Sequence, residues 1–297
     1  MGFPLVFFLP HILFAFFRKR CYTDVYESQF SLPERMGIVM KILASDFDGT
    51  FHMGENFISQ NITAVKRWQK AGNQFGIVTG RTYHMILPEL KKYHIPVDFL
   101  VCVNGAAIHE PEGNLLWAAS LPDEVSREIL SFPELDDMPL YLAATREGIA
   151  IHIHQSGDPF WDKAWPYVCN LGRLEPEEMR SLTGVIQIST VSPDSPEAHR
   201  FAAMMSKRYP GITASHVNRN YVDTTAFQAN KGQGIRMLAE KKGWNPDEIY
   251  TIGDGNNDLP MLTAFHGAAP VSAEKEVLAA VSKTVTSVAD YIEQLLA

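Results

Sequence analysis

Apolar positions between residues 40 and 106 fall into short continuous runs separated by amphipathic stretches. Three runs have the length of buried strands and end in glycine or polar residues: 41–45, 74–78 and 99–103. The stretches between them, at 59–72 and 82–93, have the spacing of amphipathic helices. Strands that alternate with helices of this length predict right-handed crossovers and a parallel sheet.

Residues 107–220 lose this alternation. Two hairpins, a strand and a helix are predicted there, at 107–120, 140–154, 184–191 and 196–209. Such a succession is typical of an α+β module. After residue 230 the alternation returns with a helix, a strand and two closing helices. The pattern therefore predicts an α/β core formed by residues 40–106 and 221–297, with an α+β domain, residues 107–220, inserted between its halves.

The amino terminus departs from both patterns. Residues 4–17 are apolar and Arg18, Lys19 and Arg20 follow them. As a helix this stretch would reach about 21 Å, less than the roughly 30 Å of a membrane's hydrocarbon core. A secretory signal carries its basic residues before the apolar stretch, so export is not expected. A weak membrane anchor through residues 1–20 is one interpretation; we favour the other, that residues 1–39 are an extension outside the fold.

Composition narrows the class of protein. The 297 residues suggest roughly two domains, and 46% of them are hydrophobic, as in a globular protein. The net charge of −8 argues against a broad face that binds nucleic acid. The chain has three cysteines, Cys21, Cys102 and Cys169, which are far apart and form no CxxC pair. This usage favours a reducing compartment such as the cytoplasm and argues against a zinc site.

Asp46 and Asp48 come directly after the first predicted strand. In nearly extended chain, residues two apart point the same way, so both carboxylates can face one site. One could attack an electrophile while the other transfers a proton, or both could hold a metal. A plain Asp-Gly turn at Gly49 is the simpler alternative.

Two further positions offer groups that bind anions. Thr79 and Gly80, at the second strand end, supply a hydroxyl and free backbone N–H groups, although a simple helix cap would look the same. Lys231 opens a predicted helix, where the helix dipole disfavours a cation. This placement suggests an anionic ligand, although a solvated lysine is the commoner explanation.

The segment from Gly253 to Asp258 carries the strongest single signal. It follows an apolar strand and contains the carboxylates of Asp254 and Asp258 together with two asparagines, one of them Asn257. These hard oxygen ligands suit Mg²⁺, and the spacing of a calcium-binding loop is absent. An Asx turn is the structural alternative.

In combination, these segments resemble the haloacid dehalogenase superfamily. Residues 46–50 match its first motif, Thr79 its second, Lys231 its third and residues 253–258 its fourth. The resemblance covers residues 40–297. The insertion between the second and third motifs resembles the Cof-type phosphatase branch, which implies a Rossmann-like parallel-sheet core with a C2-type α+β cap.

The resemblance also implies roles for individual residues. Asp46 would attack phosphorus to form an aspartyl phosphate, and Asp48 would protonate the leaving oxygen and then activate water. Mg²⁺ would be held by the side chains of Asp46 and Asp254 and the Asp48 carbonyl, with Asp258 in support. The phosphate and substrate would be bound by Thr79, Gly80, Lys231 and Asn257.

The inserted domain is expected to carry specificity. Arg146, at a predicted hairpin tip, is a candidate to touch substrate. Trp161 and Trp165, one helical turn apart, could stack on a sugar or base, although we favour packing in the core. Phe51 and His52 replace the leucine usual after the first motif; this change removes no catalytic atom and is expected to reshape the rim of the site.

The sequence thus predicts a Mg²⁺-dependent phosphomonoesterase acting on a small metabolite. A sugar phosphate is expected first, and a phosphorylated cofactor such as pyridoxal phosphate or flavin mononucleotide second. The alternatives are a phosphohexomutase with the same pair of aspartates, or a catalytically silent protein that binds a metabolite.

Overall fold

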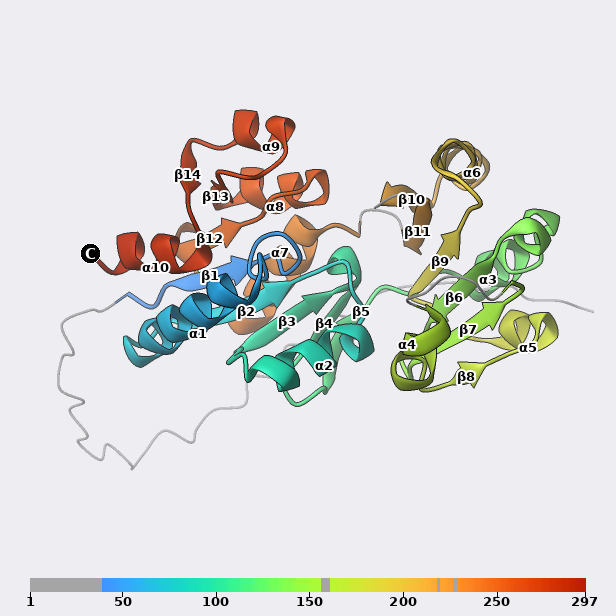
Figure 1. Cartoon of the computed structure of the whole chain (residues 1–297), viewed down its shortest axis with the longest axis horizontal. Coiled ribbons are helices and arrows are strands. Elements are labelled where there is room, and N and C mark those ends of the chain that lie inside the picture. The colour runs from blue at the N-terminus through green and yellow to red at the C-terminus, as the bar shows by residue number, and fades with distance from the viewer. Residues whose placement is uncertain (1–38, 156–160, 218–219, 227–228) are drawn as a thin grey trace, which may run out of the picture. The chain divides into compact units, whose positions relative to one another are not determined.

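The computed structural model describes residues 39–155, 161–217, 220–226 and 229–297 (Figure 1). The predictions for an N-terminal extension and for an anchor through residues 1–20 therefore lie outside the described residues, except at Val39. None of the helices in these ranges combines the length and the apolarity that a membrane crossing requires.

The main sheet has eight strands (Figure 1). In spatial order they are β14 (Lys283–Val285), β13 (His266–Pro270), β12 (Ile249–Ile252), β1 (Ile42–Ser45), β2 (Gln74–Val78), β3 (Phe99–Cys102), β4 (Ala107–His109) and β5 (Leu115–Ala118). Neighbours from β14 to β3 run parallel, as predicted for β12, β1, β2 and β3, whereas β4 and β5 join the edge as an antiparallel hairpin.

Helices cover both faces of this sheet. The helices of one face are α1 (Glu55–Lys70), α2 (Tyr83–Tyr93) and α10 (Val288–Leu296), and those of the other are α7 (Lys231–Lys242), α8 (Leu259–Ala264) and α9 (Lys275–Ala280). The fully buried Trp68 of α1 and Phe75 of β2 lie in the first of these apolar layers. The predicted α/β fold class is confirmed.

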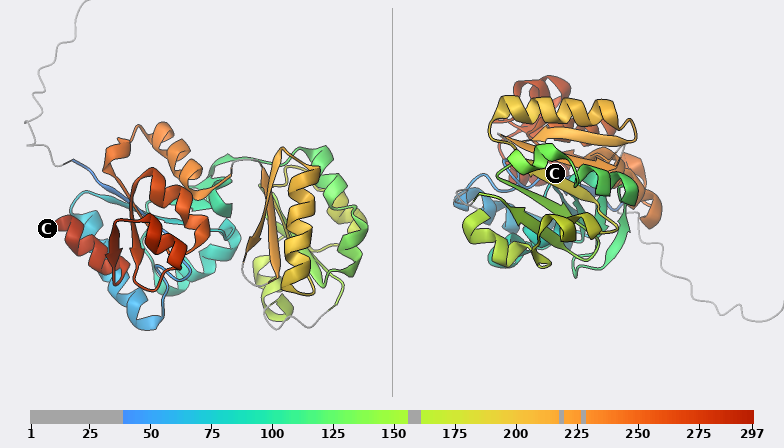
Figure 2. Two further views of the ribbon diagram at one scale, coloured as in Figure 1. Left: turned by 90° about the horizontal axis from the view of Figure 1, so that it is seen from above. Right: turned by 90° about the vertical axis from the view of Figure 1, so that its right-hand side faces the viewer.

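The insertion contains a second sheet of six strands. In spatial order they are β10 (Ile212–Val217), β11 (Tyr221–Ala226), β9 (Gln187–Val191), β6 (Leu140–Ala144), β7 (Ile149–Ile153) and β8 (Gly172–Arg173). One face packs on α3 (Asp123–Ile129), α5 (Pro176–Ser181) and α6 (Ser195–Arg208), and Figure 2 shows α6 beside β10. The opposite face carries an apolar cluster that includes Trp161 of α4 (Trp161–Val168).

Both predicted domain boundaries need correction. The hairpin of β4 and β5, which we predicted to open the inserted domain, pairs with β3 and extends the main sheet. Strand β11, which we predicted to belong to the core, pairs with β9 and β10. A strand's own sequence does not say which open sheet edge it joins, so the pattern placed these strands wrongly. We call the described residues from the end of β5 to the end of β11 the inserted domain.

Candidate active site

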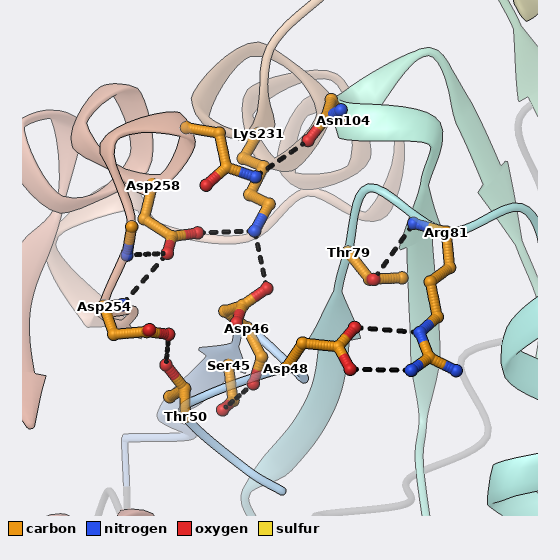
Figure 3. Close-up of polar contacts among 12 residues, drawn as sticks. Ser45, Asp46, Asp48, Thr50, Thr79, Arg81, Asn104, Lys231, Asp254 and Asp258 are labelled. Atoms are coloured by element: carbon orange, nitrogen blue, oxygen red, sulfur yellow. Dashed lines mark hydrogen bonds and ion pairs between the residues drawn. The ribbon is translucent and has the colours of Figure 1, made fainter. Parts of the chain in front are cut away.

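The carboxyl ends of β12, β1 and β2 meet at one edge of the main sheet, because these strands are parallel neighbours. Asp46 follows β1, and its N–H donates to the carbonyl of Ile252 at the end of β12 over 2.9 Å. Lys231, the first residue of α7, reaches the same point (Figure 3). The structure thus brings together residues that lie 185 positions apart in the chain.

Lys231 forms a buried ion-pair triad with two aspartates. Its Nζ donates to Oδ1 of Asp46 over 2.6 Å and to Oδ1 of Asp258 over 2.5 Å. The Lys231 side chain is only 1% exposed, so solvent screens these charges poorly. Burial would lower the pKa of Lys231, but the two carboxylates outweigh it and the pKa is raised. The ammonium group therefore stays charged.

The pKa of Asp46 is raised well above its ordinary value. Burial is the largest cause, and Lys231 opposes it. The neighbouring charges of Asp258 and Asp254 raise the pKa further. A carboxylate in such surroundings needs additional positive charge before a phosphate dianion can approach it.

Asp46, Asp254 and Asp258 can offer one oxygen each to a metal ion, with all three oxygens within 4.8 Å of one another. The backbone N–H groups of Asp254 and Gly255 both donate to Oδ2 of Asp258 over 3.0 Å. The Thr50 hydroxyl donates to Asp254, whose pKa is raised, chiefly by burial. A set of hard carboxylate oxygens held in this way fits Mg²⁺.

Asp48 turns away from this acidic cluster. Both of its carboxylate oxygens accept from the Arg81 guanidinium, at 2.8 Å from Nε and 2.6 Å from the terminal nitrogen (Figure 3). Its side chain is 54% exposed. Arg81 holds the Asp48 carboxylate in a two-point ion pair. Sequence reasoning missed this partnership, although Arg is the residue best suited to a two-point bond with a carboxylate.

Thr79 and Gly80 lie beside a second turn that was not predicted to form part of the site. In the turn after β2, the Thr79 hydroxyl accepts from the Arg81 N–H over 3.1 Å. The second turn contains Asn104, whose Oδ1 accepts from the Asn257 amide over 3.1 Å. Asn104 has a φ of +49°, in the left-handed region that asparagine tolerates. The polar residue at the end of β3 was the sequence signal that could have identified it.

These residues line a cavity of about 850 Å³. The predicted site residues in its wall are Asp46, Asp48, Thr79, Gly80, Asp254, Asn257 and Asp258. Lys231 lies behind this wall and donates a hydrogen bond to Asp46. Arg146 instead lies in the wall of a separate small pocket. The inserted domain contributes Trp161, which is buried and also faces the cavity, and whose ring N–H donates to the Tyr221 hydroxyl over 3.2 Å.

Comparison with known proteins identifies the family. Residues 43–291 match the haloacid dehalogenase-like hydrolases. The chain belongs to this family. The resemblance indicated by the four motifs is therefore confirmed, and the chain is an enzyme of a hydrolase family.

Relatives of this hydrolase include named phosphatases. The pyridoxal phosphate phosphatase YbhA of Escherichia coli is 22% identical over 85% of this chain and 97% of its own length. The 5-amino-6-(5-phospho-D-ribitylamino)uracil phosphatase YwtE of Bacillus subtilis is 25% identical over 86% of this chain and 98% of its own length. A solved subclass IIB sugar phosphatase of the superfamily has the same fold, with a TM-score of 0.70 at 22% identity over 86% of this chain and 98% of that one.

The position of Lys231 in this hydrolase depends on Gly105. Gly105 has a φ of +95°, and a Cβ there would lie 2.1 Å from the carbonyl oxygen of Asn230, the residue before Lys231. Gly72 has a similar φ of +89°, but a Cβ there would meet nothing within 4 Å.

We expect Gly105→Ala to lower the free energy of unfolding by about 3 kcal/mol or more, against about 1 kcal/mol for Gly72→Ala. Both variants carry the backbone strain, whereas only the first forces backbone atoms apart. Urea unfolding of the two proteins measures the difference. Equal losses of unfolding free energy in the two variants would contradict the close contact between Gly105 and Asn230, the residue before α7.

Proposed function

We propose that this hydrolase cleaves monophosphate esters of small metabolites, with Asp46 as the nucleophile and Mg²⁺ as cofactor. The observation that carries the proposal is the buried Asp46 carboxylate, held 2.6 Å from Lys231 in the wall of the large cavity. Asp254 and Asp258 beside it supply the remaining carboxylates of a metal site.

In the first step an Asp46 carboxylate oxygen bonds to phosphorus as the bond to the leaving oxygen breaks. Asp48, released from Arg81 and protonated, gives its proton to that oxygen. In the second step Asp48 takes a proton from water, whose oxygen bonds to phosphorus and breaks the bond to Asp46. Phosphate leaves, and both aspartates return to their starting state.

Charge stabilisation supplies most of the rate in such a reaction. Lys231 and the Thr79 hydroxyl are positioned to bind phosphoryl oxygens, and Gly80 and Asn257 line the same wall. A bound Mg²⁺ would offset the charge of the phosphate, with Asp46, Asp254, Asp258 and the Asp48 carbonyl as its ligands.

A sugar phosphate or a phosphorylated cofactor is the substrate class that we propose. The named relatives act on phosphorylated compounds of these kinds, and the cavity volume of about 850 Å³ suits such a molecule. The free thiols of Cys102 and Cys169, both buried, support our placement of the enzyme in the cytoplasm.

Metal removal tests the proposal. Phosphate release from para-nitrophenyl phosphate and a panel of metabolite phosphates should require Mg²⁺ and fall at least about 100-fold in EDTA. Added Mg²⁺ should restore it, since the carboxylates that bind the ion belong to a folded site. Turnover that is unchanged in EDTA would contradict the metal's role. Transfer of phosphate between sugar hydroxyls without release would favour the phosphohexomutase.

A further inference from the structure

The cavity wall formed by the inserted domain has an apolar half and a polar half. Leu142 of β6 pairs with Ser189 of β9, which pairs in turn with Asp223 of β11. Paired positions share one face of a sheet, so these side chains form a row. Ala144 and Gln187 form the next pair on that face, and all five residues line the cavity. Apolar side chains of β6 therefore lie beside polar side chains of β9 and β11.

The polar half is a directed chain of hydrogen bonds. The Gln187 amide donates to the Ser189 hydroxyl over 2.7 Å, and that hydroxyl donates to Oδ1 of Asp223 over 2.7 Å. The single hydroxyl proton of Ser189 is thus committed to Asp223. The chain ends in acceptors on both sides, the Gln187 carbonyl oxygen and the Asp223 carboxylate.

The acceptor of Gln187 is unsatisfied. Its Oε1 is buried and has no hydrogen-bond partner among the described residues, and the residue as a whole is only 5% exposed. Leaving a buried acceptor unpaired is unfavourable, so such an atom in a cavity wall indicates a ligand that brings a donor.

Asp223 adds a negative charge to the same wall. In the described part of the chain no Lys, Arg or His forms an ion pair with it. The neighbouring His216 pairs with Val222, and its ring stacks on that of His199 of α6, with centroids 3.9 Å apart. Asp223 pairs with Ser215, and side chains alternate along a strand, so the side chain of His216 points to the opposite face of the sheet from that of Asp223. Burial raises the pKa of Asp223, and hydrogen bonds from Ser189 and Gln187 oppose that rise.

We propose that Gln187, Ser189 and Asp223 form a subsite that selects an uncharged or cationic leaving group rich in hydroxyl or amine donors. The inference rests on the proposed phosphatase function. Donors of the leaving group bond to Asp223 and Gln187, while its C–H surface packs on Leu142, Ala144 and Trp161. A second phosphate or a carboxylate on the leaving group brings a like charge against Asp223 and offers no donor to Gln187, so such esters are rejected.

Binding to the full chain tests the subsite without relying on turnover. The Asp46→Asn variant, in Mg²⁺, is titrated by calorimetry with glucose phosphorylated on its primary hydroxyl and with phosphogluconate, its acid counterpart. We expect the neutral sugar ester to bind at least about tenfold more tightly. Adding Asp223→Asn should bring the ratio of the two dissociation constants close to one, because it removes the charge but preserves the shape.

The matched control is Asp137→Asn, which makes the same charge change at an exposed residue of the 3₁₀ turn Pro133–Asp137, outside the cavity wall. It should leave the ratio unchanged, since a general loss of negative charge is not the cause we propose. Equal affinity for the two esters in the Asp46→Asn protein, or a ratio insensitive to Asp223→Asn, would overturn the subsite. A preference that depends on Asp223 in a protein that hydrolyses no ester would instead support the subsite and refute the phosphatase.

Discussion

Replacing Asp46 with asparagine should lower kcat for every phosphate ester by about 10⁴-fold or more. The amide keeps the size of the side chain but is a poor nucleophile. Lys231 and the acids around it stay in place, so substrate binding should change far less than kcat. Phosphate release measured side by side for the two proteins, with Asp137→Asn as the charge-matched control, gives the ratio.

The fall in kcat should not come from a loss of folding stability in the Asp46→Asn variant. The raised pKa of Asp46 means that the ionised carboxylate destabilises the folded state at neutral pH, and that this cost is absent below its unfolded pKa. The asparagine variant should therefore melt at the same temperature as the native protein or higher.

Acid quenching of the native enzyme during turnover should also trap phosphate on Asp46. Residual turnover within tenfold of the native enzyme would refute Asp46 as the nucleophile.

Replacing Lys231 with methionine should cost about 3–5 kcal/mol of folding free energy as well as activity. Methionine fills a similar volume, but it leaves Asp46 and Asp258 buried side by side without their cation. Urea unfolding in EDTA measures the loss, and Lys241→Met, at an exposed position of the same helix, is the control.

The loss should depend on pH in a definite direction. Without Lys231 the pKa of Asp46 rises further, because the cation that lowers it is gone, so protonation of Asp46 on acidification relieves the repulsion between the two carboxylates. The stability difference from the native protein should therefore shrink as the pH falls from neutral toward the unfolded pKa of the aspartates. A loss that equals that of Lys241→Met, or one that grows on acidification, would show that the buried triad does not form.

Much of the fold can be predicted from the chain because local pattern and sheet geometry agree. Alternating apolar runs and helices require parallel crossovers, and parallel strands present their carboxyl ends at one edge. Asp46, Thr79 and Asp254 were expected at one site for this reason, and they line one cavity. Strands β13 and β14 were missed, because their short segments have few bulky apolar residues and become strands by pairing with β12 and with each other.

Spacing and side-chain type are local properties, so the family resemblance, the alternating core and the residues able to carry the chemistry can all be predicted from the amino-acid sequence. The folded structure alone sets the contacts between distant segments. It pairs Asp48 with Arg81, inserts Lys231 between two aspartates and excludes Arg146 from the large cavity. It also joins Gln187 to Asp223 through Ser189. Sheet register and burial, which no single segment encodes, set which charges meet and how strongly they act.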